Sequence, residues 1–496
     1  MTILHRSVST WEIFPTPQLL WVQKPASVSD SKDVTCVAVI FPVAANFSNC
    51  SFIFVLSTSP QAGLLSGVVS SNPREIAIQT LIRDPDNSGF VESLLNKNLE
   101  QSRLSGKDRA LARELTLGIA RWRLTLEWLA QRKLRAEPPE TVMLLICLGL
   151  YQLFWMRVPQ HAAVFETVEL CRIFDIERYK TLINAILRGY AREIDATRQV
   201  LEELRQKDPA RACSHPEWLY ERWKNQWGAE SALELMDWNN TIPQPYLRAN
   251  TLKIEVNELL ASLRIQGVEV EKIIFPFLTE QILLKLPSVG APHQVQGYEE
   301  GLFYIQDPAT LLAVQALNPQ PGERVLDQCA APGGKTTYIA QCMKNQGSVV
   351  AVDITERLGL IRENCTRLGL GIVQMVAVRD FQTRPSEPEY DRILLDVPCS
   401  NTGVLRRRIE ARYRLNLREL GLLKETQANL LESVAPRLKP GGTLVYSTCS
   451  LDSEENEGQV SRFLESHPEF ELLSSKLLLP HVEKTDGAFV SVLKKK

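Results

Sequence analysis

Strand and helix patterns that alternate between Arg324 and Ser447 constrain the fold of this chain more than any other feature of its sequence. Short runs rich in β-branched residues alternate there with segments of helical periodicity. The expected strands are 324–327, 348–353, 374–378, 392–396 and 443–447, and the expected helices are 335–344, 357–368 and 417–438. This order favours a doubly wound α/β sheet whose parallel strands are buried on both faces. We therefore predict a Rossmann-like domain over residues 301–496.

The rest of the 496-residue chain is expected to form further domains, because a domain averages roughly 150 residues. Residues 73–212 have helical periodicity without strand-like alternation, which predicts an all-α bundle. Residues 213–300 predict a small α+β segment between the bundle and the Rossmann-like domain. Apolar residues make up 44% of the chain and charged residues 23%, which is typical of a globular protein and excludes wholesale disorder.

Residues 1–72 differ from everything that follows, since they hold only 6 charged residues. Their apolar stretch is interrupted by Pro42 and Asn46, so it fits neither a membrane span of about 20 apolar residues nor a signal peptide. No methionine occurs between Met1 and Met143. We therefore expect translation to start at a non-ATG codon around residues 64–69 and this atypical leader to be no working domain. A tethering or targeting leader is the alternative.

The cysteines and the overall charge exclude several classes of protein. The 10 cysteines are scattered without a CxxC pair, which argues against a zinc ribbon, a thioredoxin-type motif and a secreted disulfide framework. The net charge of −2 excludes a strongly basic coat for nucleic acid. We expect free thiols in the cytoplasm, no bound metal, no membrane segment and a monomer.

A glycine-containing turn follows the first expected strand and opens a helix. Gly333 and Gly334 allow a tight turn and a close approach to a ligand, and the helix N-terminus can bind an anionic group. Nucleotide phosphate, dinucleotide pyrophosphate and the carboxylate of S-adenosylmethionine all suit such a site. The residue six before Lys335 is Cys329 instead of glycine, so the phosphate-loop pattern fails, and GxGxxG is absent as well.

Acidic residues after the next two strands favour the methyl donor among these ligands. Asp353 ends a strand 19 residues after Gly334, where a carboxylate can accept hydrogen bonds from both ribose hydroxyls. Asp380 follows the next strand. An isolated acid at a strand end is more often a helix cap, but the order of these elements supports a cofactor site.

Two cysteines and an acid follow buried strands at the edge where α/β sheets bind ligands. Asp396 and Cys399 come just after one strand, and Cys449 comes just after another. This set matches what methylation at cytosine C5 requires. A thiolate adds to C6 and makes C5 nucleophilic, an acid at N3 stabilises the developing charge, and a base removes the C5 proton so that the thiolate can leave.

At these residues the chain resembles the RNA cytosine-5 methyltransferases, and more narrowly the bacterial RsmB/Sun family that modifies 16S ribosomal RNA. The resemblance covers about residues 73–496. It rests on four catalytic-domain segments, VLDQCAAPGGKTT, VVAVDIT, DRILLDVPCSNTGVLRR and GGTLVYSTCSLDSEENE. The helical region, with SGKDRALARELTLGIARW, LGLYQLFWMRVPQHAAVFETVEL and LINAILRGY, is similar to the family's NusB-like RNA-binding domain. The segments YLRANTLK and GLFYIQDPAT are similar to its middle region.

The resemblance implies transfer of a methyl group from S-adenosylmethionine to C5 of cytosine 967 in 16S rRNA through a covalent Cys–C6 intermediate. Cys449 would be the nucleophile, Cys399 would serve product release and Asp396 would be the acid. Since DNA cytosine methyltransferases attack with the cysteine of a Pro-Cys motif, Cys399 remains an alternative nucleophile. The implied cofactor-binding residues are Cys329, Ala330, Ala331, Pro332, Gly333, Gly334, Lys335, Asp353, Asp380 and Asp396.

One segment departs from the family pattern. Relatives read RR-H-P-D where this chain reads Arg406-Arg-Arg-Ile-Glu410, so the proline is missing. The run 406–418 still holds six arginines and one acid, which suits RNA phosphates. We predict RNA contacts at Arg406, Arg407, Arg408 and Arg412, and a solvated helix face is the alternative. A tRNA methyltransferase and a non-catalytic ribosome-assembly factor that keeps the fold are the other functional interpretations.

Overall fold

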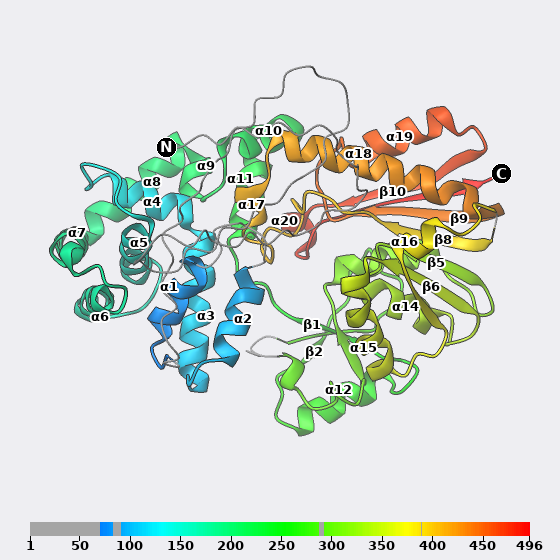
Figure 1. Ribbon diagram of the computed structural model, residues 1–496, viewed down its shortest axis with the longest axis horizontal. Coiled ribbons are helices and arrows are strands. Elements are labelled where there is room, and N and C mark those ends of the chain that lie inside the picture. Colours follow the sequence, from blue (N-terminus) through cyan, green and yellow to red (C-terminus); the bar gives the residue numbers. More distant parts are fainter. Residues whose placement is uncertain (1–69, 83–90, 287–291, 388) are drawn as a thin grey trace, which may run out of the picture. The chain divides into compact units, whose positions relative to one another are not determined.

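The computed structural model describes residues 70–82, 91–286, 292–387 and 389–496 (Figure 1). The predicted leader lies outside the described residues up to position 69. The described elements form three consecutive stretches, which are all-helical, mixed with short strands, and alternating between strand and helix. Among the described helices, none is both long and apolar enough to cross a membrane.

The first stretch is helical throughout its described residues, as predicted. It consists of α1 (Pro73–Ile82), α2 (Val91–Glu100), α3 (Gly106–Arg121), α4 (Arg123–Gln131), α5 (Glu140–Phe154), α6 (Gln160–Ile173), the 3₁₀ turn η1 (Glu177–Tyr179), α7 (Lys180–Arg192), α8 (Ile194–Lys207) and α9 (Pro209–Ala212). Helix α5 is the centre of the bundle, because every residue from 142 to 153 is buried. A helix that is apolar on all sides must be surrounded, and α1, α3, α4, α6 and α7 all contact it.

The second stretch contains a small antiparallel sheet. It consists of α10 (Glu217–Trp227), α11 (Ala229–Asn239), β1 (Tyr246–Ala249), α12 (Val256–Ile265), β2 (Glu271–Lys272), β3 (Leu283–Lys285), η2 (Pro292–Gln294) and β4 (Phe303–Ile305). The strand order among the described residues is β2-β3-β1-β4. Because β4 pairs with β1, this sheet extends past the predicted boundary at residue 300.

The third stretch carries the predicted α/β sheet. It consists of η3 (Pro308–Thr310), α13 (Leu311–Leu317), β5 (Arg324–Gln328), α14 (Gly334–Cys342), β6 (Ser348–Asp353), η4 (Thr355–Arg357), α15 (Leu358–Leu368), β7 (Val373–Ala377), α16 (Val378–Gln382), β8 (Tyr390–Asp396), α17 (Ala411–Arg414), α18 (Leu417–Val434), η5 (Ala435–Arg437), β9 (Leu438–Thr448), α19 (Glu457–Ser466), β10 (Phe470–Leu478), α20 (Pro480–Glu483) and β11 (Ala488–Lys495). The described strands form one sheet in the order β10-β11-β9-β8-β5-β6-β7. The strands from β9 to β7 are parallel, as predicted. The antiparallel strands β10 and β11 were not predicted, and they make the sheet mixed.

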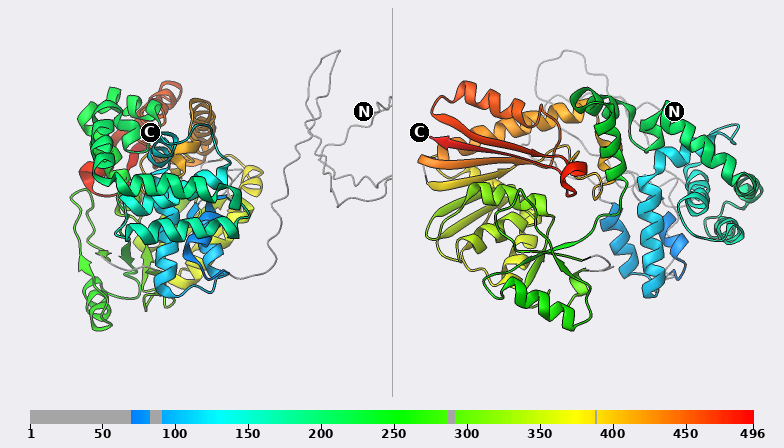
Figure 2. Two further views of the ribbon diagram at one scale, coloured as in Figure 1. Left: turned by 90° about the vertical axis from the view of Figure 1, so that its left-hand side faces the viewer. Right: turned by 180° about the vertical axis from the view of Figure 1, so that it is seen from behind.

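Both faces of this sheet are covered by helices (Figures 1 and 2). Side chains alternate along a strand, so Val325 of β5 packs in the cluster with α13 and α14, while Leu326 packs in the cluster with α18 and α19. Helix α15 covers the same face as α14, because its Ile361 contacts the cluster around Ala351 of β6. Burial on both faces explains why these strands read as continuous apolar runs.

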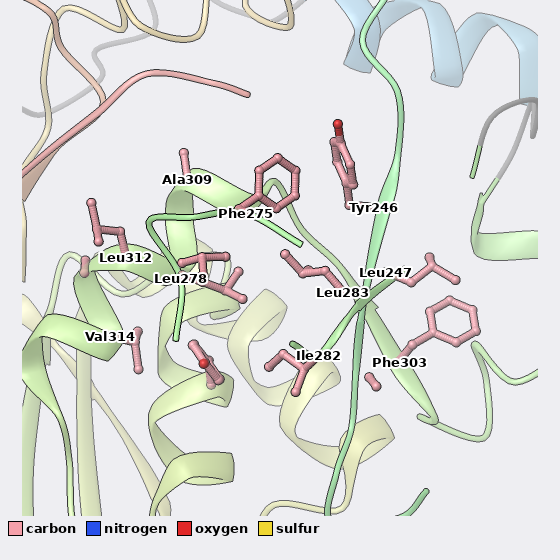
Figure 3. Close-up of a cluster of buried hydrophobic side chains, with 14 of the residues drawn as sticks. Tyr246, Leu247, Phe275, Leu278, Ile282, Leu283, Phe303, Ala309, Leu312 and Val314 are labelled. Carbon is pink, nitrogen blue, oxygen red and sulfur yellow. The ribbon is translucent and has the colours of Figure 1, made fainter. Parts of the chain in front are cut away.

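The small sheet and the large sheet share one hydrophobic core (Figure 3). Leu247, Leu283 and Phe303 come from the small sheet, whereas Leu312 and Val314 come from α13 beside the large sheet. All five side chains are buried, with Leu312 the most exposed at 8%. The middle segment, which is the second stretch, is therefore joined to the α/β sheet by apolar packing as well as by the covalent chain.

Candidate active site

The turn between β5 and α14 has the backbone conformation that its glycine predicts. Cys329 has a φ of +64° and Gly333 a φ of +100°. Gly333 N donates a hydrogen bond to Ala330 O at 2.8 Å and closes the turn. A Cβ on Gly333 would lie 3.3 Å from Ile361 Cα at a φ that side chains rarely adopt. The turn therefore requires glycine at this position.

A cavity of about 380 Å³ lies where β5, β8 and β9 end at their carboxyl sides. This is the edge at which open α/β sheets bind ligands. The predicted site residues that line the cavity are Cys329, Ala330, Ala331, Pro332, Gly334, Lys335, Asp396, Arg407, Arg408 and Cys449. The predicted residues outside its lining are Gly333, Asp353, Asp380, Cys399, Arg406 and Arg412.

Asp396 is held at the cavity wall by a cation and a hydroxyl group. Lys335 Nζ donates to Asp396 Oδ2 at 2.7 Å, and Ser447 Oγ donates to Asp396 Oδ1 at 2.6 Å. Burial alone would lower the pKa of Lys335, but the charge and hydrogen bond of Asp396, with a further contribution from Cys449, raise it. Lys335 therefore remains an ammonium group that pairs with Asp396.

Cys399 and Cys449 meet although 50 residues separate them in sequence. Both are free thiols, and their sulfurs lie 2.9 Å apart. Cys449 is half-buried and lines the cavity, whereas Cys399 is buried behind it. The hydrogen bond with Cys449, burial and nearby negative charge raise the pKa of Cys399 well above its usual value. Asn401, which sequence reasoning did not single out, accepts a hydrogen bond from Cys449 Sγ at 3.3 Å.

The two acids after β6 and β7 have different positions. Asp353 is buried and accepts hydrogen bonds from Ala331 N and Ile354 N, both at 2.8 Å, so it shapes the turn that lines the cavity. Asp380 lies in α16 with 66% of its side chain exposed, 3.6 Å from Arg379. The structure thus brings Asp353, but not Asp380, to the predicted cofactor site.

Asp327 is a further acid in the cavity lining, and sequence reasoning did not select it. It is fully buried, it lines the cavity, and its Oδ2 accepts a hydrogen bond from Thr336 Oγ1 at 2.5 Å. Its Oδ1 has no hydrogen-bond partner among the described residues. Burial raises the pKa of Asp327 to about 7, partly offset by the Thr336 hydrogen bond. An orphaned acceptor beside a glycine turn fits the α-ammonium group of S-adenosylmethionine, so the residues present suit this cofactor. In the sequence, the available signal for this site was an acidic residue within the strand-forming segment Val325–Gln328.

The pKa of Asp327 predicts a pH-dependent affinity for S-adenosylmethionine. Only the ionised carboxylate attracts an ammonium group, so we expect affinity to rise as the pH increases from 6 to about 7, where most of an α-amino group with a pKa of about 7.7–8.0 is still protonated. Asp327→Asn should weaken binding at pH 7.5 by roughly 10-fold or more and flatten the pH dependence. Isothermal titration calorimetry measures both effects, and Asp391→Asn, on a carboxylate that does not line the cavity, is the control. Unchanged affinity and pH dependence in Asp327→Asn would contradict the assignment.

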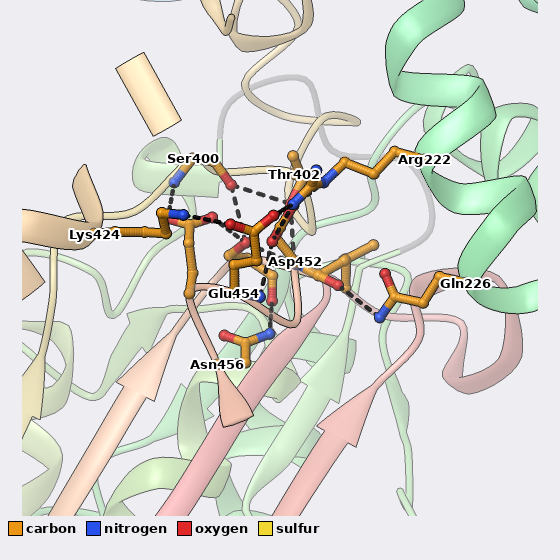
Figure 4. A network of polar contacts seen from close by, with 11 residues as sticks. Arg222, Gln226, Ser400, Thr402, Lys424, Asp452, Glu454 and Asn456 are labelled. Carbon is orange, nitrogen blue, oxygen red and sulfur yellow. Dashed lines mark hydrogen bonds and ion pairs between the residues drawn. The ribbon is translucent and has the colours of Figure 1, made fainter. Parts of the chain in front are cut away.

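A polar network fixes the loop after Cys449 (Figure 4). Glu455 is fully buried and accepts hydrogen bonds from Ser400 N at 2.9 Å and from Ser450 Oγ. It thereby joins the loop after β8 to the loop after β9. Arg222 of α10 pairs with Asp452 and Glu454 of the same loop. The middle segment therefore anchors the loop that carries the nucleophile candidate.

Arg406 and Arg412, which were predicted to contact RNA, both have buried side chains that bind other parts of the chain in this structure. Arg406 lies 4.3 Å above the Trp238 ring. Arg412 has no exposed surface and donates to Asn240 Oδ1 at 2.9 Å and to Ser214 O at 3.2 Å. Its neighbour Tyr413 donates to a carbonyl group of α3 at 2.9 Å. The first part of the arginine run therefore joins the third stretch to the first and second stretches.

We expect Arg412→Met to lower the stability of the protein. The substitution keeps the length of the side chain but leaves several buried carbonyl groups without a donor, each worth about 1–3 kcal/mol. Burying the guanidinium cation was itself costly, and removing it offsets part of this effect. We therefore expect the free energy of unfolding to fall by a net amount of about 3 kcal/mol. Differential scanning fluorimetry should show a lower melting temperature than for Arg418→Met, a change at an exposed position of the same run. Equal melting temperatures would contradict this role.

Comparisons with known proteins agree with this architecture. Residues 314–494 match the family described as 16S rRNA methyltransferase RsmB/F, residues 71–192 match the NusB family, and residues 215–288 match the RsmF/B-like ferredoxin-like domain. A Bacillus subtilis (strain 168) protein named probable ribosomal RNA small subunit methyltransferase B is 34% identical over 85% of this chain and 98% of its own length. Ribosomal RNA small subunit methyltransferase B of Yersinia pseudotuberculosis is 37% identical over 86% of this chain and 99% of its own.

Solved structures share the fold. The crystal structure of PH0851 has a TM-score of 0.70 and 26% identity and covers 86% of this chain and 100% of its own. A methyltransferase homologue from Pyrococcus horikoshii has a TM-score of 0.51 and 30% identity over 60% of this chain and 99% of its own. With three family matches in order along the chain and relatives above 30% identity over most of its length, the chain belongs to the ribosomal RNA small subunit methyltransferase B family.

Proposed function

We propose that this protein methylates C5 of cytosine 967 in 16S rRNA, with S-adenosylmethionine as the methyl donor and a covalent bond between Cys449 and C6 as the intermediate. One observation carries the proposal. Cys449 shares a single cavity with the Lys335–Asp396 pair, a glycine turn and the orphaned oxygen of Asp327. These groups would supply the nucleophile, the acid and the cofactor site that C5 methylation needs.

The cofactor would lie against residues 329–335 and Asp327, with Asp353 holding the turn in shape. When bound, it supplies an electrophilic methyl group. The cavity volume of about 380 Å³ falls within the usual range for small-molecule sites. A base in a duplex would have to be flipped out to reach Cys449, so we expect a single-stranded or flipped target.

The protein groups around the base divide the chemistry between them. The Cys449 thiolate adds to C6, and Asp396 would form a hydrogen bond at N3 as the electron pair moves to C5. Lys335 lies 2.7 Å from Asp396 and holds that carboxyl in place. Cys449 is also one of the groups that raise the pKa of Lys335.

Cys399 is suited to the later step in which the C5 proton leaves and the Cys449–C6 bond breaks. Its raised pKa keeps it a neutral thiol before addition, and the hydrogen bond with Cys449 is the largest cause. Once Cys449 is a thioether, it can no longer carry a charge or donate a proton. Cys399 can then lose its own proton to solvent more readily, and its thiolate can accept the C5 proton, so that the C5–C6 double bond re-forms and Cys449 departs as a thiolate. This order also favours Cys449 over Cys399 as the attacking thiol.

The proposal is tested with purified protein, S-adenosyl-[methyl-³H]methionine, and either a 16S rRNA fragment or tRNA. We expect label in the 16S fragment, 5-methylcytidine after digestion to nucleosides, and one modified position by mass spectrometry. Label in tRNA alone would support the tRNA methyltransferase interpretation instead. No label in either RNA, with the protein still required for small-subunit assembly, would support the non-catalytic factor.

A further inference from the structure

An ion-pair cluster that the proposed chemistry does not use lies in the wall of the same cavity. Arg407 Nε donates to Asp486 Oδ2 at 2.7 Å, and Arg407 Nη2 donates to Asp307 Oδ2 at 2.9 Å. Arg407 Nη2 also donates to Gln244 O at 3.1 Å, and Asp486 N donates to Asp307 Oδ1 at 3.1 Å. The cluster joins the loop after β8, the segment before β11, the segment before α13 and the middle segment.

Burial makes this ion-pair cluster costly to break. The side chains of Asp307 and Asp486 are each 4% exposed, and that of Arg407 is 30% exposed. Burial and the charge of Asp307 raise the pKa of Asp486 to about 6, although Arg407 and Arg406 oppose the rise. Removing Arg407 would leave two buried carboxylates close together without their main counter-ion, and such a pair is strongly unfavourable.

A short chain of backbone hydrogen bonds links the cluster to the nucleophile. Gly487, next to Asp486, donates from N to Gly403 O at 2.7 Å, and Gly403 N donates to Cys449 O at 2.9 Å. The three backbones are packed too closely for a side chain between them. A Cβ on Gly403 would lie 2.7 Å from Cys449 O and 2.9 Å from Gly487 Cα. A shift of Asp486 would therefore be transmitted to the backbone of Cys449.

We propose that Arg407 is a positioning residue for Cys449, which acts by clamping Asp307 and Asp486 and not by binding RNA phosphate. The inference rests on the proposed function, since Cys449 is the nucleophile there. A guanidinium group can bind two carboxylates at once because its donors form a rigid planar fork. Both carboxylates already occupy that fork in the structure.

The test compares Arg407→Lys and Arg407→Met with Arg462→Met, the same change at an exposed arginine of α19. We expect Arg407→Met to lower kcat roughly 100-fold, the effect of a displaced reacting group, with the KM for 16S rRNA within about 2-fold of wild type. Arg407→Lys should lower kcat roughly 10-fold, because an ammonium group cannot bridge both carboxylates in the same geometry. Arg462→Met should behave as wild type.

A second measurement needs no RNA. Iodoacetamide labelling followed by peptide mass spectrometry gives the alkylation rate of each cysteine in the full chain. We expect Arg407→Met to speed alkylation of Cys449 at least 3-fold, because its loop is released, while the buried Cys147 and Cys171 remain slow and show that the protein is folded. The alkylation experiment therefore tests the positioning role of Arg407 independently of methylation. If wild-type protein methylates no 16S rRNA, the proposed function fails, but the alkylation result still stands.

The opposite pattern would overturn the inference. If Arg407 binds phosphate, Arg407→Met should raise the KM and Kd for RNA, reduce the salt dependence of binding by about one ion, and leave kcat unchanged. Unchanged Cys449 alkylation together with unchanged kcat would also overturn it.

Discussion

Cys449→Ala is expected to abolish methyl transfer to 16S rRNA, with a rate at least about 10⁴-fold below wild type. Loss of a covalent nucleophile has effects of this size because the remaining groups cannot activate C5. Cys399 is not expected to take over, since its side chain is buried outside the cavity lining. The measurement is incorporation of labelled methyl groups under single-turnover conditions.

Cys342→Ala is the matched control, because Cys342 is a half-buried thiol on α14 outside the cavity lining. It should retain wild-type activity. Affinity for S-adenosylmethionine should be unchanged in both variants. Activity in Cys449→Ala, or loss of activity in Cys399→Ala without any adduct, would instead make Cys399 the nucleophile.

Cys399→Ala should trap the protein on its substrate. Without this thiol the addition and methyl transfer still proceed, but removal of the C5 proton slows, so the Cys449–C6 bond persists. A band of higher mass on a denaturing gel should appear with S-adenosylmethionine and a 16S rRNA fragment, and it should be absent from the Cys399→Ala/Cys449→Ala double variant. Normal turnover by Cys399→Ala without a stable adduct would remove Cys399 from the release step.

Periodic segments made the α/β sheet predictable from the sequence. Strand β6 has the predicted bounds, and β5 and α14 differ by no more than two residues at either end. Doubly buried strands consist of unbroken apolar runs, and the glycine turn is a local signal. The site residues Lys335, Asp396 and Cys449 were predictable for the same reason, since each lies at or after the carboxyl end of a strand at one edge of the sheet.

The features that sequence reasoning missed depend on contacts between distant segments. Strand β10 is exposed over most of its length and lacks a clear alternation, so it could not be recognised before its partner β11 was known. Arg412 looked like a surface cation, yet carbonyl groups from three separate segments surround it. The orphaned oxygen of Asp327 could not be predicted either, because an unsatisfied atom is a property of the packed structure.

The burial of Arg412 and the pairing of Arg222 with Asp452 bear on how this chain can be divided or recombined. A fragment that begins at Gly301 would keep every cavity group named for catalysis, but Arg412 would lose its acceptors at residues 121, 214, 239 and 240. Strand β4 would lose β1, its pairing partner. The catalytic half is therefore not an interchangeable module. A chimaera of two relatives would have to take the contacting surfaces of α3, α10 and α11 from the same parent as the catalytic half.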